Sequence, residues 1–274
     1  MHLFFKIALA FLLGKKIIYF IKTRLVMKFE NGIFEENYKI SYSQMGIHDV
    51  LTNRSFLSLM ENLTGQHSAY CHFSFADIAK DNLTWVILNW KLQVFRRPKD
   101  EEEVVVETWG RFFNKVYVLR DYKVIDDDGN LCAIATSKWC LIDNKKRKIA
   151  HLPDNLDEIY HGFRSESVFN VDDFPKLNAS FDVEPSFKDE YKIRRFDLDI
   201  NHHVHNLNYL NFAYELLPMD VYTGNELNNV EIAYKKEIKY GETIHSFLYV
   251  ENNQYTIVIK DEDEQLIHSI IKLY

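Results

Sequence analysis

Residues 196–217 decide the fold, and they read Phe-Asp-Leu-Asp-Ile-Asn-His-His-Val-His-Asn-Leu-Asn-Tyr-Leu-Asn-Phe-Ala-Tyr-Glu-Leu-Leu. The first half of this stretch is rich in Asp, Asn and His, whereas the second half is mostly apolar. At about 100° per residue, the apolar side chains from Val204 onward cover more than half of a helix circumference. Such a helix belongs in a core, and Pro218 ends it. The sequence therefore predicts a buried helix with a polar site at its mouth.

The composition places this helix in a globular chain. The protein has 274 residues, 47% of them hydrophobic and 15% aromatic, so one large or two small domains can form a sizeable core. A net charge of −7 argues against a nucleic-acid partner. The three cysteines, Cys71, Cys132 and Cys140, lack CxxC spacing. They are typical of reduced core thiols, and we expect a cytoplasmic protein.

The N-terminal segment 1–26 is apolar and then basic. Its uncharged run 7–14 is too short to span a bilayer, Lys15 and Lys16 interrupt it, and no small-residue cleavage site follows. Two interpretations remain, a weak membrane segment or a gene-start artefact with Met27 as the true start. We expect membrane contact only under the first, and expect a chain that begins at Met27 to be active.

The remaining chain shows one order of elements twice. The first half contains a strand at 34–43, a helix at about 51–69, and strands at 85–94, 104–113, 117–125 and 132–142. Asp127-Asp128-Gly129-Asn130 predicts a hairpin turn. Residues 143–186 carry a basic run and three prolines, which indicates a connection with little sheet of its own. The second half contains a strand at 191–195, the buried helix, and strands at 229–238, 243–251, 255–260 and 266–273.

Aligning the two halves supports a duplication. Tyr38-Lys39-Ile40 matches Tyr191-Lys192-Ile193, and Trp90-Lys91 matches Tyr234-Lys235. A helix followed by antiparallel strands that wrap it is the hot-dog arrangement. We therefore predict an α+β tandem double hot-dog, each unit a curved antiparallel sheet around a central helix. The predicted parts are an N-terminal hot-dog at 27–150, a linker at 151–186, and a C-terminal hot-dog at 187–274.

Four separated motifs resemble one enzyme family. The run Asp199-x-Asn201-x-His203-Val204-His205-Asn206-x-x-Tyr209, preceded by Asp197-Leu198, resembles the D-L-D-x-N-x-H-V-N-N-x-x-Y signature of the plant and bacterial Fat-type acyl-acyl carrier protein thioesterases. Similar segments of that family match Trp85-Val86 with 104–109, Ser137-Lys138-Trp139 with Asn144 and Arg147, and Tyr234-Lys235-Lys236-Glu237. The resemblance runs from about Met27 to the C-terminus.

The resemblance implies a double hot-dog hydrolase that frees fatty acid from acyl carrier protein and terminates fatty-acid synthesis. It implies no cofactor, no metal and an acyl carrier protein partner, and leaves a homodimer open. Two positions depart from the pattern. Ile238 stands where the family has a cysteine after its glutamate, so no thiol nucleophile is available there, and His205 replaces the first Asn of H-V-N-N. The implied catalytic residues are Asp199, Asn201, His203 and Glu237, and we expect Met60, Leu63, Trp85, Asn206 and Tyr209 to contact the substrate.

The same residues suit thioester hydrolysis on chemical grounds. Glu237 or His203 can position and deprotonate a water molecule, and Asp199 can orient the His203 ring. Asn201 and the free N–H groups of the helix start can stabilise the oxyanion. The apolar hot-dog interior can take the acyl tail.

Other interpretations stay open for each group. Asp199 and Asn201 could simply cap the helix, and Glu237 could be a solvent-facing strand residue. The cluster of His202, His203 and His205 could bind a metal, although its spacing is poor for joint ligation. The basic run 145–148 could be a solvated hairpin end or could dock an acidic carrier protein.

The first half lacks the implied catalytic set. At the offsets of the repeat, Asp199, Asn201, His203 and Glu237 correspond to Gly46, His48, Val50 and Gln93. We therefore expect one active site per chain, in a catalytic C-terminal hot-dog at 187–274, with the N-terminal hot-dog at 27–150 left to shape the acyl pocket. The competing functions are a thioesterase acting on coenzyme A esters and a non-catalytic hot-dog acyl-binding regulator.

Overall fold

A single antiparallel sheet forms the frame of the molecule. The computed structural model describes residues 28–112, 114–169, 173–224 and 227–274, so predictions about segment 1–26 lie outside the described residues. Twelve strands join in the order β1-β2-β4-β5-β6-β3-β9-β12-β11-β10-β8, and β7 pairs with β6. The strands are β1 (Lys28–Glu30), β2 (Ile33–Lys39), β3 (Leu83–Val94), β4 (Glu103–Phe112), β5 (Tyr117–Asp126), β6 (Leu131–Asp143), β7 (Lys148–Ala150), β8 (Phe187–Lys192), β9 (Asn229–Tyr234), β10 (Thr243–Glu251), β11 (Gln254–Asp261) and β12 (Ile267–Leu273).

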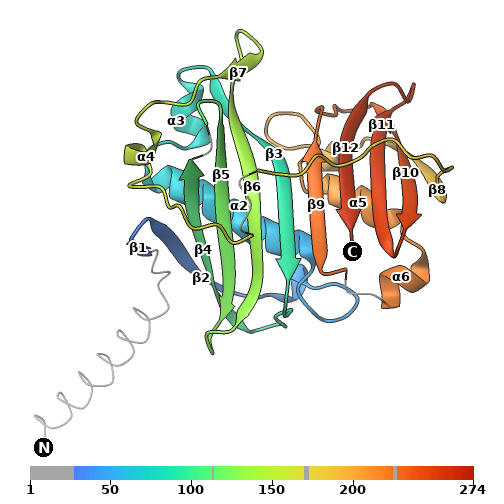
Figure 1. The fold of residues 1–274 in the computed structure, drawn as a ribbon, viewed down its shortest axis with the longest axis horizontal. Helices are drawn as coiled ribbons and strands as arrows, with labels where there is room; N and C mark the ends of the chain where they lie inside the picture. The colour runs from blue at the N-terminus through green and yellow to red at the C-terminus, as the bar shows by residue number, and fades with distance from the viewer. Residues whose placement is uncertain (1–27, 113, 170–172, 225–226) are drawn as a thin grey trace, which may run out of the picture.

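The strand order confirms the duplication. The first half runs β2-β4-β5-β6-β3, and the second half repeats that order as β8-β10-β11-β12-β9. The two halves meet where β3 pairs with β9, with Trp90 opposite Ile232 (Figure 1). Both of these side chains are buried. The predicted α+β double hot-dog is therefore confirmed, with one continuous sheet across both units.

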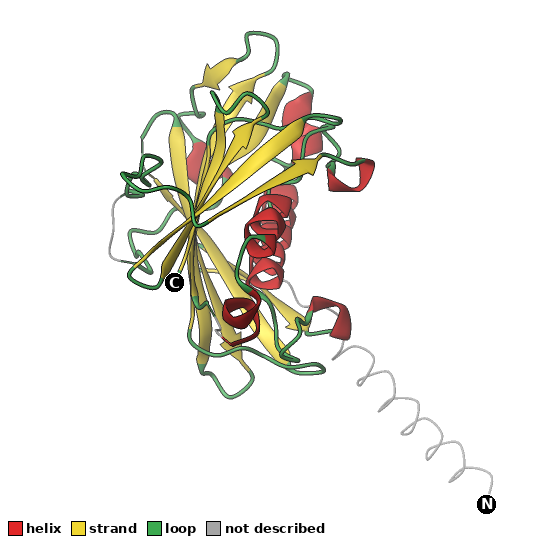
Figure 2. Cartoon of the chain, turned by 90° about the vertical axis from the view of Figure 1, so that its right-hand side faces the viewer, coloured by secondary structure: helices red, strands yellow, loops and turns green. Residues whose placement is uncertain are grey.

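The two longest helices, α2 (Asn53–Tyr70) and α5 (Asn208–Glu215), lie on one face of this sheet (Figures 1 and 2). Helix α2 begins after Thr52, whose hydroxyl accepts the Ser55 N–H at 3.1 Å and so caps the first turn. Its apolar residues, including Phe56, Met60 and Leu63, are fully buried against the curved sheet. The helices are α2 (Asn53–Tyr70), α3 (Phe75–Ala79), α4 (Leu156–Ile159), α5 (Asn208–Glu215) and α6 (Met219–Gly224).

Helix α5 is shorter than predicted. It ends before Pro218 as expected, but it begins at Asn208 and not near Val204. Val204 donates its N–H to the Ile238 carbonyl at 2.9 Å and forms a β-bridge with Leu198. This long-range pairing holds Val204 in an extended backbone, so the polar residues before α5 lie in a loop.

The second correction concerns β9, predicted over 229–238. The strand ends at Tyr234 because the N–H groups of Lys235 and Lys236 both reach the His268 carbonyl, at 2.8 and 3.2 Å, which breaks the regular ladder. The chain then leaves the sheet, and Glu237 lies beyond the strand.

The connection between the halves crosses the sheet face opposite the helices (Figures 1 and 2). Lys138 of β6 pairs with Asp173 at 2.8 Å, and the indole N–H of Trp109 donates to the Glu166 carbonyl at 3.1 Å. Among the described residues of this connection, the predicted lack of sheet holds except for the short strand β7. No helix among the described residues is long and apolar enough to cross a bilayer.

Candidate active site

A tight loop at 198–205 carries most of the polar residues of the signature. The Asp199 carboxylate accepts the backbone N–H of Asn201 at 2.8 Å and of His203 at 3.1 Å, and the Asp199 N–H donates to the His203 carbonyl at 2.7 Å. His202 takes a φ of +63° to close the turn. Asp199 therefore fixes the loop backbone, and it holds His203 through the main chain and not through the ring.

A second segment brings a carboxylate to this loop. His203 forms an antiparallel bridge with Lys239, next to the bond between Val204 and Ile238. This pairing places the His203 Nε2 atom 3.7 Å from Glu237 Oε1. The separation is longer than a direct hydrogen bond, so one small group can contact both side chains. Both side chains are about one third exposed, so a substrate can reach them.

Residues just before α5 link the loop to the first half of the chain. The Asn206 side chain donates to Glu61 Oε1 of α2 at 2.8 Å, and the Asn206 carbonyl accepts the Tyr234 hydroxyl at 3.0 Å. The His205 ring accepts the Leu207 N–H through Nδ1 at 3.2 Å, so its proton belongs on Nε2. Oδ1 of Asn206 is buried and has no hydrogen-bond partner among the described residues. The site is thus built from both hot-dog units.

Glu61 has an unusual setting. The side chain is half-buried, and burial raises the pKa of its carboxyl, against the lowering effects of His205, Asn206 and Arg54. Sequence reasoning missed this residue because it stands on the first helix, far in sequence from the motif. Its only sequence signal was a carboxylate among the apolar residues of a core helix.

These groups line a cleft of about 700 Å³ between the two halves. One wall consists of the loop and the segment after β9. The opposite wall comes from β3 and β6, including Trp85 and Trp139, and from the hairpin before β7, including Asn144 and Arg147. The cleft is therefore wide enough for a small-molecule substrate and open to a larger partner.

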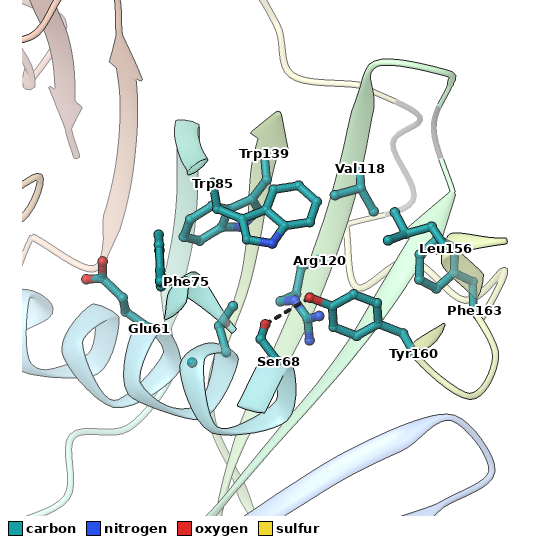
Figure 3. A pocket seen from close by; sticks show the side chains of 12 residues that line it. Glu61, Ser68, Phe75, Trp85, Val118, Arg120, Trp139, Leu156, Tyr160 and Phe163 are labelled. Carbon is teal, nitrogen blue, oxygen red and sulfur yellow. Dashed lines mark hydrogen bonds between the residues drawn. The ribbon is translucent and has the colours of Figure 1, made fainter. Parts of the chain in front are cut away.

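A narrower pocket of about 50 Å³ continues from this cleft (Figure 3). The two share Glu61, Phe75, Trp85 and Trp139. The pocket lies between α2 and the sheet of the first half, and Val118, Leu156 and Phe163 add apolar surface. A polar site beside a largely apolar pocket matches the layout of an enzyme for an amphipathic acyl substrate.

The structure brings most of the predicted site residues together. Met60 and Leu63 are the exceptions: they are fully buried and line neither cavity, because α2 turns its other face, with Thr64, Gly65 and Ser68, to the pocket. The predicted residues that line the cleft are Asp199, Asn201, His203, Glu237, Trp85, Asn206 and Tyr209.

Two alternative interpretations can now be decided. The simple capping role of Asp199 is wrong, because its carboxylate binds N–H groups of its own loop. The strand interpretation of Glu237 is wrong, because β9 ends before it. Among the described residues, no group of three or more His, Cys, Asp or Glu side chains is placed to hold a metal ion. Burial raises the pKa of Cys140, which lines the cleft, to about 11, so its thiol stays protonated.

The first half has an equivalent cleft with different chemistry. Gly46, His48 and Val50 line this second cavity of about 550 Å³. The His48 ring lies 3.4 Å from the Tyr222 carbonyl, and Gln93 lies inside β3. Glu215 also lines this second cleft, but among the described residues no carboxylate approaches the His48 ring as Glu237 approaches that of His203.

Comparison with known proteins places these features in one family. The family model for the acyl-ACP thioesterase N-terminal domain matches residues 31–160, and the model for the C-terminal domain matches residues 181–271. An oleoyl-acyl carrier protein thioesterase from Coriandrum sativum is 25% identical over 87% of this chain and 69% of its own length. An oleoyl-acyl carrier protein thioesterase from Arabidopsis thaliana is 24% identical over 79% of this chain, which spans 64% of that relative.

Solved structures show the same fold. An acyl-ACP thioesterase from Bacteroides thetaiotaomicron superposes with a TM-score of 0.80 at 23% identity, covering 90% of this chain and 99% of that one. A 12:0-ACP thioesterase from Umbellularia californica gives a TM-score of 0.81 at 21% identity, covering 90% and 98% of the two chains.

Proposed function

Because the chain belongs to the acyl-ACP thioesterase family, we propose that it hydrolyses the thioester of acyl-acyl carrier protein, releases the free fatty acid and so ends chain growth in fatty-acid synthesis. The observation that carries this function is the approach of His203 to Glu237 in a cleft that opens into an apolar pocket.

In the proposed mechanism, water attacks the thioester carbonyl. Glu237 and His203 contact that water from two sides, and one of them takes its proton. The protonated partner then delivers a proton to the departing thiolate. Such acid–base roles each contribute about 10²–10⁴-fold.

Asn201 and Asp199 support the reacting groups in this proposal. The Asn201 side chain lines the cleft and supplies an amide donor for the oxyanion that forms on the carbonyl. Asp199 acts as a positioning residue, because it orders the backbone that carries both Asn201 and His203. Asn206 and Tyr209 line the route from the cleft toward Glu61.

The acyl carrier protein is the proposed partner. Basic residues Arg147, Lys235, Lys236 and Lys239 stand around the cleft, where they suit the phosphate of a carrier arm and an acidic carrier surface. The three cysteines are free and buried, which fits the proposed cytoplasmic location. A homodimer stays a prediction that size-exclusion chromatography with light scattering can check.

The test is hydrolysis of a series of acyl carrier proteins, each loaded with one chain length, by the purified chain. We expect saturable release of free acid, lost in His203→Ala. Faster turnover of matched coenzyme A esters would favour the coenzyme A thioesterase, and tight acyl binding without turnover would favour the regulator.

A further inference from the structure

A guanidinium group forms part of the wall of the narrow pocket. Arg120 stands on β5 and is only 6% exposed, yet it lines the pocket together with Ser68 and Tyr160. Figure 3 shows Glu61 toward one end of the pocket, the two tryptophans in the middle, and Arg120 beyond them beside Tyr160. A charge at this position is unexpected in a pocket for a hydrocarbon chain.

The contacts of Arg120 are all to neutral groups. Its Nη1 atom lies 2.9 Å from His67 Nδ1 and 3.2 Å from Thr108 Oγ1, and its guanidinium carbon lies 5.2 Å from the centre of the Tyr160 ring. Burial, reinforced by the Arg120 charge, lowers the pKa of His67 to about 2, so this imidazole stays neutral and accepts the bond.

Arg120 forms no ion pair with the described residues. The contrast is Arg111 on the neighbouring strand, which is equally buried and binds the Asp121 carboxylate at 2.8 Å. Removing a cation from water is costly unless an anion or several hydrogen bonds replace the water. A methyl group at the chain end would desolvate Arg120 further and offer no acceptor in return.

We propose that the inner end of this pocket binds an oxygen-bearing group at the far end of the acyl chain, so that the preferred substrates are ω-oxygenated acyl thioesters, and best of all ω-carboxylates. A carboxylate can take two parallel N–H bonds from one guanidinium, the strongest pairing open to Arg120. Ser68 Oγ and Tyr160 OH, which lie 2.9 Å apart, add hydroxyl groups beside it. This inference rests on the proposed thioesterase function.

The size of the pocket limits the chain that fits. A volume of about 50 Å³ holds roughly three to five water-sized groups beyond the cleft. The end of a short or medium chain therefore reaches Arg120, whereas a long chain requires the pocket to widen.

The test compares carriers that differ only at the chain end. Acyl carrier proteins loaded with a straight acyl chain, its ω-hydroxy counterpart and its ω-carboxy counterpart are hydrolysed over a series of matched lengths. At the length that reaches Arg120, we expect the wild-type kcat/KM to favour the ω-carboxy chain over the straight chain by on the order of 10-fold or more. A straight-chain preference at every length would overturn the inference.

Two variants and a matched control test whether Arg120 causes the preference for the ω-carboxy chain. Arg120→Met should reverse the preference, and Arg120→Lys should retain part of it because the charge remains. Val118→Leu, in the same pocket, should shift the preferred length and leave the ratio of ω-carboxy to straight chain unchanged. These ratios are taken within one variant, so partial loss of folded protein does not alter them. Unchanged ratios in Arg120→Met would contradict the proposal.

Ligand binding separates this inference from the thioesterase function itself. Calorimetry measures how free dicarboxylates and monocarboxylates of equal length bind to the wild-type chain and to Arg120→Met. Tighter dicarboxylate binding that needs Arg120, with no hydrolysis of any carrier, would support the polar subsite while the proposed function fails. Hydrolysis of straight-chain carriers, with no dicarboxylate binding that depends on Arg120, would contradict the polar subsite and leave the proposed thioesterase function intact.

Discussion

At the residue scale, the proposed chemistry depends on side chains that meet only in the folded protein. His203 lies in a loop held by Asp199, and Glu237 lies in the segment just after β9. The backbone pairing between these segments brings the two side chains to a separation of 3.7 Å. Small changes in either side chain should therefore affect turnover much more than folding.

The first prediction compares the two clefts. His203→Ala and Glu237→Ala should each lower kcat on acyl carrier protein substrates by on the order of 10²-fold or more, because each removes an acid–base group. The double variant should lose much less than the product of the two single losses, since the residues act as one unit. His48→Ala, at the equivalent first-half position, should keep most of the activity. Equal losses at His48 and His203 in folded protein would refute a single site.

The second prediction concerns the pH dependence of stability. Burial raises the pKa of the Glu61 carboxyl in the folded state. The free energy of unfolding therefore falls as pH rises through the folded-state pKa, because the unfolded chain releases this proton more easily. At acid pH the carboxyl is protonated in both states, so it causes no such loss of stability. Glu61→Gln keeps an acceptor for Asn206 and removes the buried charge. The variant should therefore gain free energy of unfolding relative to wild type at alkaline pH and gain less at acid pH. Urea denaturation at both pH values measures this difference, and a gain that grows toward acid pH would show that the sign is wrong.

At the scale of elements, α2 serves two purposes with two faces. One face packs Phe56, Met60 and Leu63 into the core, and the other lines the narrow pocket with small or polar groups. Gly65 lies on this second face, and a Cβ atom added there would meet no atom within 4 Å. The helix therefore controls the volume of the pocket without being part of the catalytic set.

The third prediction concerns a substitution that fills the narrow pocket at Gly65. Gly65→Leu should shift the preference toward shorter acyl chains, because the new side chain occupies the pocket. It should not destabilise the helix, since Leu is a better helix former than Gly by roughly 0.5–1 kcal/mol. Competition assays with mixed carrier chain lengths measure the shift, and thermal melting checks stability. Asn62→Leu, on the exposed side of α2, is the control that should leave the length profile unchanged. An unaltered profile in Gly65→Leu would remove this face from the substrate path.

At the scale of the whole molecule, the two hot-dog units share one sheet and one core. β3 and β9 pair across the junction, and α2 and α5 lie on the same face of the sheet (Figure 1). The cleft proposed as the active site is lined by both units, because Glu61 and Trp85 come from the first and His203 and Glu237 from the second. The duplicated halves thus share one strand order but place different side chains in their clefts.

The fourth prediction tests this coupling. Ile232→Ala at the junction should lower the free energy of unfolding by about 2–5 kcal/mol, because it leaves a cavity next to Trp90. Urea unfolding should remain a single transition, since the loss affects the core of both halves. All four tryptophans lie in the first half, so their fluorescence reports that half while circular dichroism reports the whole chain. Val250→Ala, on the more exposed β10 surface, should change stability by about 0.5 kcal/mol or less. Separate midpoints for the two signals would show that the halves unfold independently.

Local sequence patterns determined the elements, the family and most of the cleft. Alternating apolar residues placed the strands to within a few positions, and helical spacing placed α2 because its own residues and the Thr52 cap favour that helix. The signature located Asp199, Asn201 and His203, since all three belong to one loop. The repeat predicted the doubled strand order, because both halves carry the same local pattern.

Tertiary structure decided whatever depends on contacts between distant segments. Val204 is extended because Ile238 pairs with it, and Glu61 joins the site because α2 meets the segment just before α5 at Asn206. Arg120 becomes buried beside the narrow pocket because β5 packs against His67 and Tyr160. Met60 and Leu63 were predicted to contact the substrate, but both lie in the core because the curved sheet covers that face of α2. Periodicity reveals that a face is apolar, but only the packing of other elements decides whether it meets a pocket or a core.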